Sequence, residues 1–75
     1  MEFHEELDAS GMTSPLPVLH AKKRLDKMDS GHILKIIATD PGSVSDIAAF
    51  TNQTGHELLE SREEEGKFYY LMKKR

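Results

Sequence analysis

The chain contains no cysteine and no tryptophan among its 75 residues. Without cysteine it can form neither a disulfide nor a thiolate metal site. It has only three phenylalanines, so its core must be mainly aliphatic, and a chain of this length buries only a thin core. We therefore expect a single domain over residues 1–75 with little room for an internal pocket and with its function on the surface.

A strong positive charge and a long apolar run are also missing. The formal net charge is −3, which argues against direct nucleic-acid binding, although contact through a partner stays open. No apolar run approaches the length of a membrane span, and no signal-peptide pattern opens the chain. We expect a soluble cytoplasmic protein with no membrane partner. Its histidines (His4, His20, His32 and His56) lack ligand spacing, so we predict no metal site and no cofactor.

Apolar periodicity, together with glycine and proline, divides the chain into six predicted elements. Strands are predicted over residues 3–8, 32–39, 56–61 and 67–73, the first of them at a sheet edge. Helices are predicted from residue 14 or 15 to 28, and from residue 40 or 43 to 54. This order predicts an α/β fold, namely a two-layer α/β sandwich of the form β-α-β-α-β-β. In it, a four-stranded mixed sheet carries two helices on one face.

The same patterns predict which side chains point into the core. In the first helix the apolar stripe is Val18, Ala21, Leu25 and Met28. In the second helix the predicted inner residues are Val44, Ile47, Ala48 and Thr51. In the strands, Leu34, Ile36 and Ala38 are predicted to face the helices, and Phe68, Tyr70 and Met72 are predicted to alternate toward one face of the sheet. The charged stretch that ends in Gly66 is predicted to be a solvated turn.

The segment from Gly11 to Pro17 differs from the rest of the chain, whose residues have mainly structural roles. Its Pro15 and Pro17 fix the backbone and remove N–H donors that the first turn of a helix leaves unused. Residue 14 is therefore predicted to stand at a rigid helix N-terminus. From the spacing alone, Ser14 before a proline is typical of a helix N-cap. No Ser-His-Asp or G-x-S-x-G pattern surrounds it, so a serine-nucleophile enzyme is the weakest interpretation.

Three stretches together resemble the TusA (SirA-like) sulfur-carrier family. Residues 7–17, in which X-Pro-X-Pro opens a basic amphipathic helix, are similar to the family's CPxP signature. Residues 38–43, with the letters Ala-Thr-Asp-Pro-Gly-Ser, and residues 50–58 are similar to two further family stretches. The matches run from about residue 7 to residue 72 in the family's order and spacing.

The resemblance implies a small sulfurtransferase-type carrier protein and not a true turnover enzyme. Members take up sulfane sulfur as a persulfide on the CPxP cysteine. Their protein partners are a cysteine desulfurase, a rhodanese or a DsrE-type sulfurtransferase. The sulfur then passes toward tRNA thiolation, molybdenum cofactor or sulfur oxidation. A thiolate suits a helix N-terminus, where partial positive charge lowers a cysteine pKa.

This chain departs from the family at the sulfur-bearing position, because Ser14 stands where the family keeps its cysteine. A second cysteine that some relatives have near the position of Thr51 is also missing. A hydroxyl holds no transferable sulfur, so the chain as written has no active thiol. Ser14 is then either an introduced replacement or a natural loss of the chemistry. The alternative function is a non-catalytic interaction or regulatory module that kept the fold.

A contact surface for protein partners is predicted around residue 14. Leu16 and Leu19 lie off the buried stripe of the first helix, and Lys22 continues their ridge by one turn. Asp40 is predicted at a strand end close to the same place. Ser14 is thus the predicted carrier position. The predicted partner-binding residues are Pro15, Leu16, Pro17, Leu19, Lys22 and Asp40.

Overall fold

The computed structural model describes residues 2–75. Its elements follow the predicted order of strand, helix, strand, helix, strand and strand. Their bounds are β1 Glu5–Ala9, α1 Leu16–Asp26, β2 Ile33–Ala38, α2 Ser43–Thr54, β3 Glu57–Glu64 and β4 Lys67–Lys73. Among the described residues, no helix is both long enough and apolar enough to cross a membrane.

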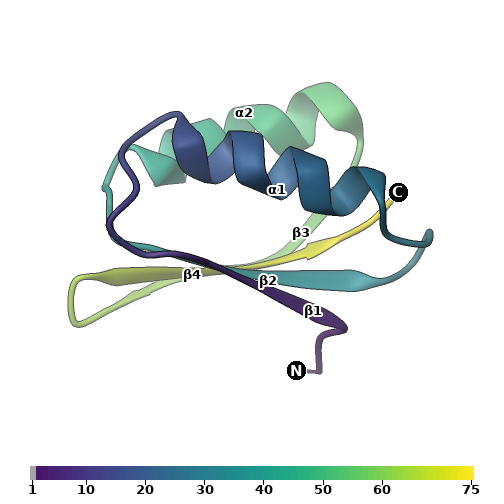
Figure 1. The fold of residues 1–75 in the computed structure, drawn as a ribbon, viewed down its shortest axis with the longest axis horizontal. Coiled ribbons are helices and arrows are strands. Elements are labelled where there is room, and N and C mark those ends of the chain that lie inside the picture. The colour runs from purple at the N-terminus through teal and green to yellow at the C-terminus, as the bar shows by residue number, and fades with distance from the viewer. Residues whose placement is uncertain (1) are drawn as a thin grey trace.

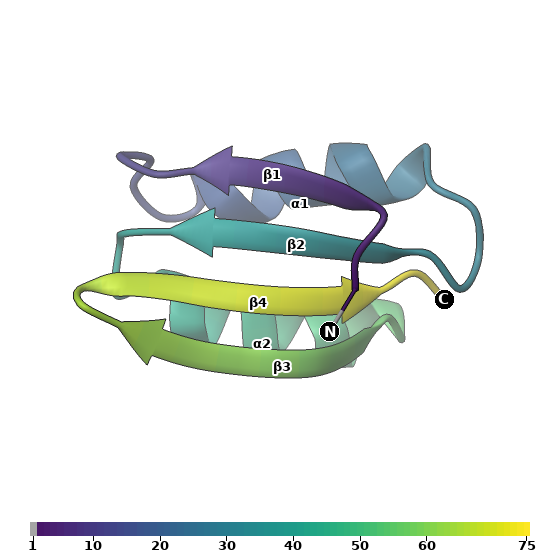
Figure 2. The ribbon, with the colours of Figure 1, turned by 90° about the horizontal axis from the view of Figure 1, so that it is seen from below.

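The four strands form one mixed sheet in the order β1-β2-β4-β3, so β1 is an edge strand. β1 runs parallel to β2, because α1 returns the chain to the end of the sheet where β1 began. The other two neighbouring pairs are antiparallel. Figure 1 shows α1 and α2 on one face of the sheet, and Figure 2 shows the strands from the opposite side. The predicted two-layer α/β sandwich is therefore confirmed.

The core lies between the sheet and the two helices. Alternate residues of β2 and β4 point into it, as the period of two in a strand requires. They are Leu34, Ile36 and Ala38, which are predicted to face the helices, and Phe68, Tyr70 and Met72, which are predicted to share one face. Leu7 and Ala9 of β1 complete this layer. Ser43 is the one buried polar side chain among residues 2–75, and its hydroxyl lies 2.7 Å from the Tyr70 hydroxyl.

The buried stripe of α1 follows the prediction, with small shifts at the ends of the helix. Ala21 and Leu25 are fully buried, Met28 is buried, and Val18 packs partly against the core. The helix begins at Leu16 and ends two residues before Met28. The last residues are held by tighter backbone bonds, such as the N–H of Met28 donating to the Leu25 carbonyl at 3.0 Å. Met28 therefore reaches the core from a turn and not from the helix.

The buried face of α2 differs from the prediction. Val44 and Ala48 are predicted to face inward, but both are exposed. The buried residues of α2 are Ser43, Ile47 and Phe50. Because the Ser43 hydroxyl bonds Tyr70 below the helix, position 43 must point inward. The next residue, Val44, is then turned about 100° around the helix axis and faces outward.

The closing hairpin is longer than predicted. β3 continues to Glu64, so Glu63 and Glu64 belong to a strand and not to the turn. The turn itself is Glu65 and Gly66, which both have positive φ, 51° and 81°. Positive φ at both positions is typical of a type I′ turn, which matches the twist of the flanking strands. Because the turn is only two residues long, the pairing of β3 with β4 continues to Glu64, the last residue of β3.

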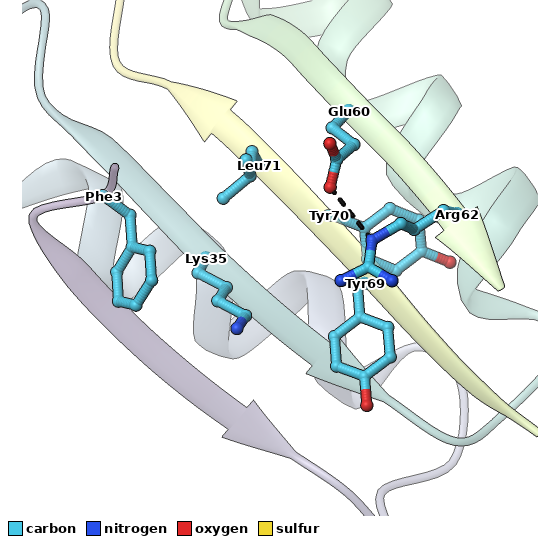
Figure 3. Close-up of a pocket in the computed structure, with 7 residues that line it drawn as sticks. All are labelled: Phe3, Lys35, Glu60, Arg62, Tyr69, Tyr70 and Leu71. Atoms are coloured by element: carbon cyan, nitrogen blue, oxygen red, sulfur yellow. Dashed lines mark hydrogen bonds and ion pairs between the residues drawn. The ribbon is translucent and has the colours of Figure 1, made fainter. Parts of the chain in front are cut away.

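On the face of the sheet away from the helices, a shallow hollow lies over β2 and β4 (Figure 3). The Lys35 Nζ lies 5.1 Å from the centre of the Phe3 ring and 5.6 Å from that of Tyr69. Arg62 covers the Tyr69 ring at 4.6 Å and pairs with Glu60 at 3.1 Å. The two cations of the hollow thus rest on aromatic rings and a carboxylate of the same face.

Candidate functional site

Residue 14 lies in the loop between β1 and α1, at the edge of the sheet where two parallel strands end. β1 ends at Ala9 and β2 ends at Ala38, and these two residues are paired in register. The loops that follow them therefore leave the sheet side by side. They are joined by the N–H of Gly11, which donates to Thr39 Oγ1 at 2.9 Å.

Three contacts hold Ser14 against the second loop and the second helix. Its backbone N–H donates to Asp40 Oδ2 at 2.7 Å. Its hydroxyl donates to Asp46 Oδ2, in the first turn of α2. Gly42 approaches so closely that a Cβ at that position would lie 3.2 Å from the Ser14 Cβ. The structure thus gathers Ser14, Asp40 and Asp46 at one point, of which only Ser14 and Asp40 are predicted from the sequence.

Asp46 is the residue that sequence reasoning missed. It follows Ser43 by three positions, which is the spacing of a capping box, S-x-x-D/E. An acidic residue in a first helical turn is usually explained by the N-terminus of its own helix. In this structure no side chain of residues 2–75 caps α2, and the carboxylate bonds Ser14 of the neighbouring loop. The signal was visible in the sequence, but it pointed to a local role.

The interpretation of Ser14 as a helix N-cap is wrong. α1 begins at Leu16, Pro15 occupies the cap position, and no described side chain caps this helix. Ser14 precedes the cap position by one residue, and its hydroxyl turns to α2 instead. Both Ser14 and Pro15 are exposed, and the peptide bond between them is cis.

The predicted partner-binding residues of α1 divide into exposed and buried ones. Leu16 and Leu19 have exposed fractions of 42% and 48%, which are high for leucine. Lys22 is exposed and pairs with Asp26 one turn further along. Pro17, in contrast, is fully buried, so it packs α1 onto the core and its side chain is not available to a partner. Val44, which is not among the predicted residues, is exposed in the first turn of α2.

Two opposing electric fields act at residue 14. α1 and α2 run in the same direction, with both N-termini at this end of the sheet (Figure 1). The unpaired N–H groups of a helix N-terminus carry partial positive charge and favour an anion. Asp40 and Asp46, however, place two carboxylates within hydrogen-bond distance of residue 14. Carboxylates at that distance disfavour a second negative charge.

Three of the four histidines, His4, His32 and His56, are engaged elsewhere. The rings of His4 and His32 stack with their centres 4.2 Å apart. His56 Nδ1 accepts a hydrogen bond from the backbone N–H of Arg75 at 3.0 Å, and burial lowers the pKa of this imidazole. Across the described part of the chain, no three His, Asp or Glu side chains gather as a metal site. The Ser14 hydroxyl bonds a carboxylate and not an imidazole, which is not the arrangement of a serine nucleophile.

The chain matches known proteins both in sequence and in fold. The family model described as Sulfurtransferase TusA matches residues 5–74. The chain is 62% identical to Sulfur carrier protein TusA of Allochromatium vinosum over 73 residues, which cover 97% of this chain and 96% of that protein. It is 42% identical to Sulfur carrier protein TusA of Pseudomonas putida over 69 residues, which cover 92% of this chain and 86% of that protein.

A solved structure has the same fold. The SirA-like protein of Desulfitobacterium hafniense matches with a TM-score of 0.82, over 93% of this chain and 96% of that chain. Its sequence identity is 22%, so this likeness shows the fold alone. The family model and the A. vinosum relative each cover nearly the whole chain. The resemblance seen in the sequence is therefore confirmed, and the chain belongs to the TusA (SirA-like) family.

Proposed function

We propose that the chain is the carrier protein of a sulfur relay, with residue 14 at the position that holds the sulfur. One observation carries the proposal: residue 14 is exposed where the N-termini of α1 and α2 meet, in a chain whose relatives are named sulfur carrier proteins. The family resemblance assigns the CPxP cysteine to this position. With Ser14 there, the chain is inactive in sulfur transfer.

The chemistry that the site would support with a thiol at position 14 is simple exchange. The thiolate would attack the outer sulfur of a donor persulfide, R–S–SH. A new S–S bond would form at position 14 and the donor S–S bond would break. The donor would leave as a thiolate, which takes up the proton that the thiol at position 14 had lost. No outside oxidant is needed, because one persulfide is consumed for each one formed. A serine oxygen gives no transferable persulfide.

Protein partners would dock beside residue 14. Pro15, Leu16, Leu19, Lys22 and Asp40 form the proposed contact surface, from which Pro17 is left out because it is buried. Exposed leucines next to a reacting position suit a partner that covers the site during transfer. A cysteine desulfurase, a rhodanese or a DsrE-type sulfurtransferase would be such a partner. We place the relay in the cytoplasm, where thiols stay reduced.

The decisive experiment is to restore the thiol. Ser14→Cys should gain the mass of one sulfur atom when it is incubated with a cysteine desulfurase and cysteine, and should lose it to a reductant. Intact-mass spectrometry measures both steps. An enzymatic donor is needed because inorganic polysulfide would load any exposed thiol.

Two control proteins make the result specific. The Ser14 protein should gain no sulfur, since it has no cysteine. Ser30→Cys places a thiol in an exposed turn beyond the C-terminal end of α1, so it tests whether any exposed cysteine is loaded. If Ser14→Cys gains no more sulfur than Ser30→Cys, the chain is not a carrier scaffold.

The second candidate function is a non-catalytic interaction or regulatory module. Its supporting observation is that Ser14 is tied to α2 through Asp46 in a chain that has no thiol at all. Such a module should bind its partner equally well as the Ser14 protein and as Ser14→Cys, without sulfur. Failed loading together with undiminished binding would favour this function over the carrier.

A further inference from the structure

We propose that Asp46 is a positioning residue of this site, which holds the side chain of residue 14 in its protonated, hydrogen-bonded state. The inference rests on the proposed function, since it concerns the position that would carry sulfur. It starts from the hydrogen bond that the Ser14 hydroxyl donates to Asp46 Oδ2. A thiol at position 14 would donate to the same oxygen, whereas a thiolate has no proton to donate and would face a like charge.

The backbone of Asp46 is fixed on both sides. Ser43, three residues earlier, is fully buried and bonds Tyr70 across the core. Ile47, the next residue, is fully buried as well. The N–H of Asp46 donates to the Gly42 carbonyl at 3.2 Å, within the first turn of α2. The carboxylate is therefore set on a rigid element and aimed at a loop that the same helix terminus touches.

The charge of Asp46 has no cationic partner of its own among residues 2–75. Lys22 pairs with Asp26, Arg24 with Glu5, Lys35 with Glu6, and Arg62 with Glu60 and Glu64. Asp40 is a second charged group at residue 14; it carries the same sign as Asp46 and accepts the backbone N–H of Ser14.

Opposite in effect are the N-termini of α1 and α2, which favour an anion. A full charge at hydrogen-bond distance acts more strongly than a partial charge spread over a helix turn. In the free protein, the pKa of a thiol here would thus be higher than the two helix N-termini alone would make it. The thiol would ionise more readily if a substitution removed the charge of Asp46.

The test compares Ser14→Cys with the double variant Ser14→Cys/Asp46→Asn. Asparagine keeps the shape and an acceptor oxygen but removes the charge. The thiol pKa is read from the rate of iodoacetamide alkylation between pH 6 and 10. We expect the double variant to have a thiol pKa lower by about one unit.

The curves of alkylation rate against pH should cross for the two variants. At pH 7 the double variant should react about threefold faster, because more thiolate is present. At the alkaline end it should react about threefold slower, because a thiolate of lower pKa is a weaker nucleophile. A change in accessibility alone would move the rate in one direction at every pH, and that result would overturn the proposal.

Matched variants guard against other causes. In the Ser14→Cys background, Asp46→Glu keeps the charge and should keep the higher thiol pKa. Asp26→Asn removes an exposed carboxylate from the C-terminal end of α1 and should leave the thiol pKa unchanged. If Asp46→Asn fails to fold by circular dichroism, Asp46→Ser tests the same loss of charge. An unchanged thiol pKa in a folded, uncharged variant rejects the role of Asp46.

Loading by a cysteine desulfurase separates this inference from the proposed function. Sulfur loading of Ser14→Cys with no pKa change in the double variant would uphold the carrier and overturn the role of Asp46. A lower pKa in the double variant, with no loading of either protein, would uphold the control by Asp46 and reject the carrier.

Discussion

The hydroxyl groups of Ser43 and Tyr70 lie 2.7 Å apart in the core, below the first turn of α2. Ser43 is fully buried and Tyr70 is 1% exposed, so each hydroxyl depends on the other for its hydrogen bond. Burial raises the pKa of the Tyr70 phenol, which therefore stays neutral. This pair lies on the buried face of α2 together with Ile47 and Phe50, and the rotation that buries this face brings Asp46 to residue 14.

Breaking this pair should be costly, while removing both hydroxyls should not be. Tyr70→Phe leaves the buried Ser43 hydroxyl without its partner and should lower the free energy of unfolding by about 1–2 kcal/mol. Ser43→Ala should cost a similar amount. The double variant should cost clearly less than the sum, since no buried donor is then left unpaired. Urea unfolding measures all three, and strictly additive losses would show that the two hydroxyls do not stabilise each other.

The fold was largely predictable from the sequence, because each element carries its own period. In β2 the alternation of Leu34, Ile36 and Ala38 with residues of the outer face requires a strand with one covered face. In α1 the spacing of Ala21 and Leu25 requires a helix with one buried stripe. These local patterns and the global packing agree, so the layers follow without knowledge of any contact.

The details that failed are those that depend on a neighbour. Val44 looks like a core residue in its own helix, but the bond of Ser43 with Tyr70 of β4 turns it outward. Asp46 looks like a helix-terminus acid, but the pairing of β1 with β2 brings Ser14 to it from 32 positions away. A one-dimensional pattern records neither contact. The place of residue 14 between a strand and a helix could be predicted because it depends on local patterns. Its contact with Asp46 could not, because it depends on tertiary packing.

Stability should fall in mildly acidic solution because of His56. Its Nδ1 accepts the N–H of Arg75, and burial, with the nearby charge of Lys74 as the next cause, lowers its pKa below the ordinary histidine value of about 6.5. The unfolded chain then binds a proton at a pH where the folded chain does not, so stability is lost as the pH falls below about 6.5.

His56→Gln should therefore lose less stability than the unsubstituted protein between pH 7.5 and 5. Denaturant unfolding at several pH values gives this slope, and an NMR titration of the His56 ring gives its pKa directly. Equal slopes for the two proteins, or a His56 pKa above 6.5, would contradict the prediction.

The exposed ridge of Leu19 and Lys22 should matter for binding and not for folding. Leu19→Ala should change the free energy of unfolding by less than about 0.5 kcal/mol, as is usual for a surface position. Lys22→Ala should cost as little, because its pair with Asp26 is solvent-exposed. Both variants should weaken binding to a cysteine desulfurase in isothermal titration calorimetry, since they remove the apolar and the charged part of one contact surface.

Leu25 provides the matched comparison, because it lies on the fully buried face of the same helix. Leu25→Ala should lower the free energy of unfolding by about 2–5 kcal/mol through the cavity it leaves. A loss of that size for Leu19→Ala would place Leu19 in the core and remove it from the proposed surface. Unchanged binding by a stable Leu19→Ala/Lys22→Ala variant would show that partners approach residue 14 from another side, where Val44 is an exposed, large apolar residue of α2.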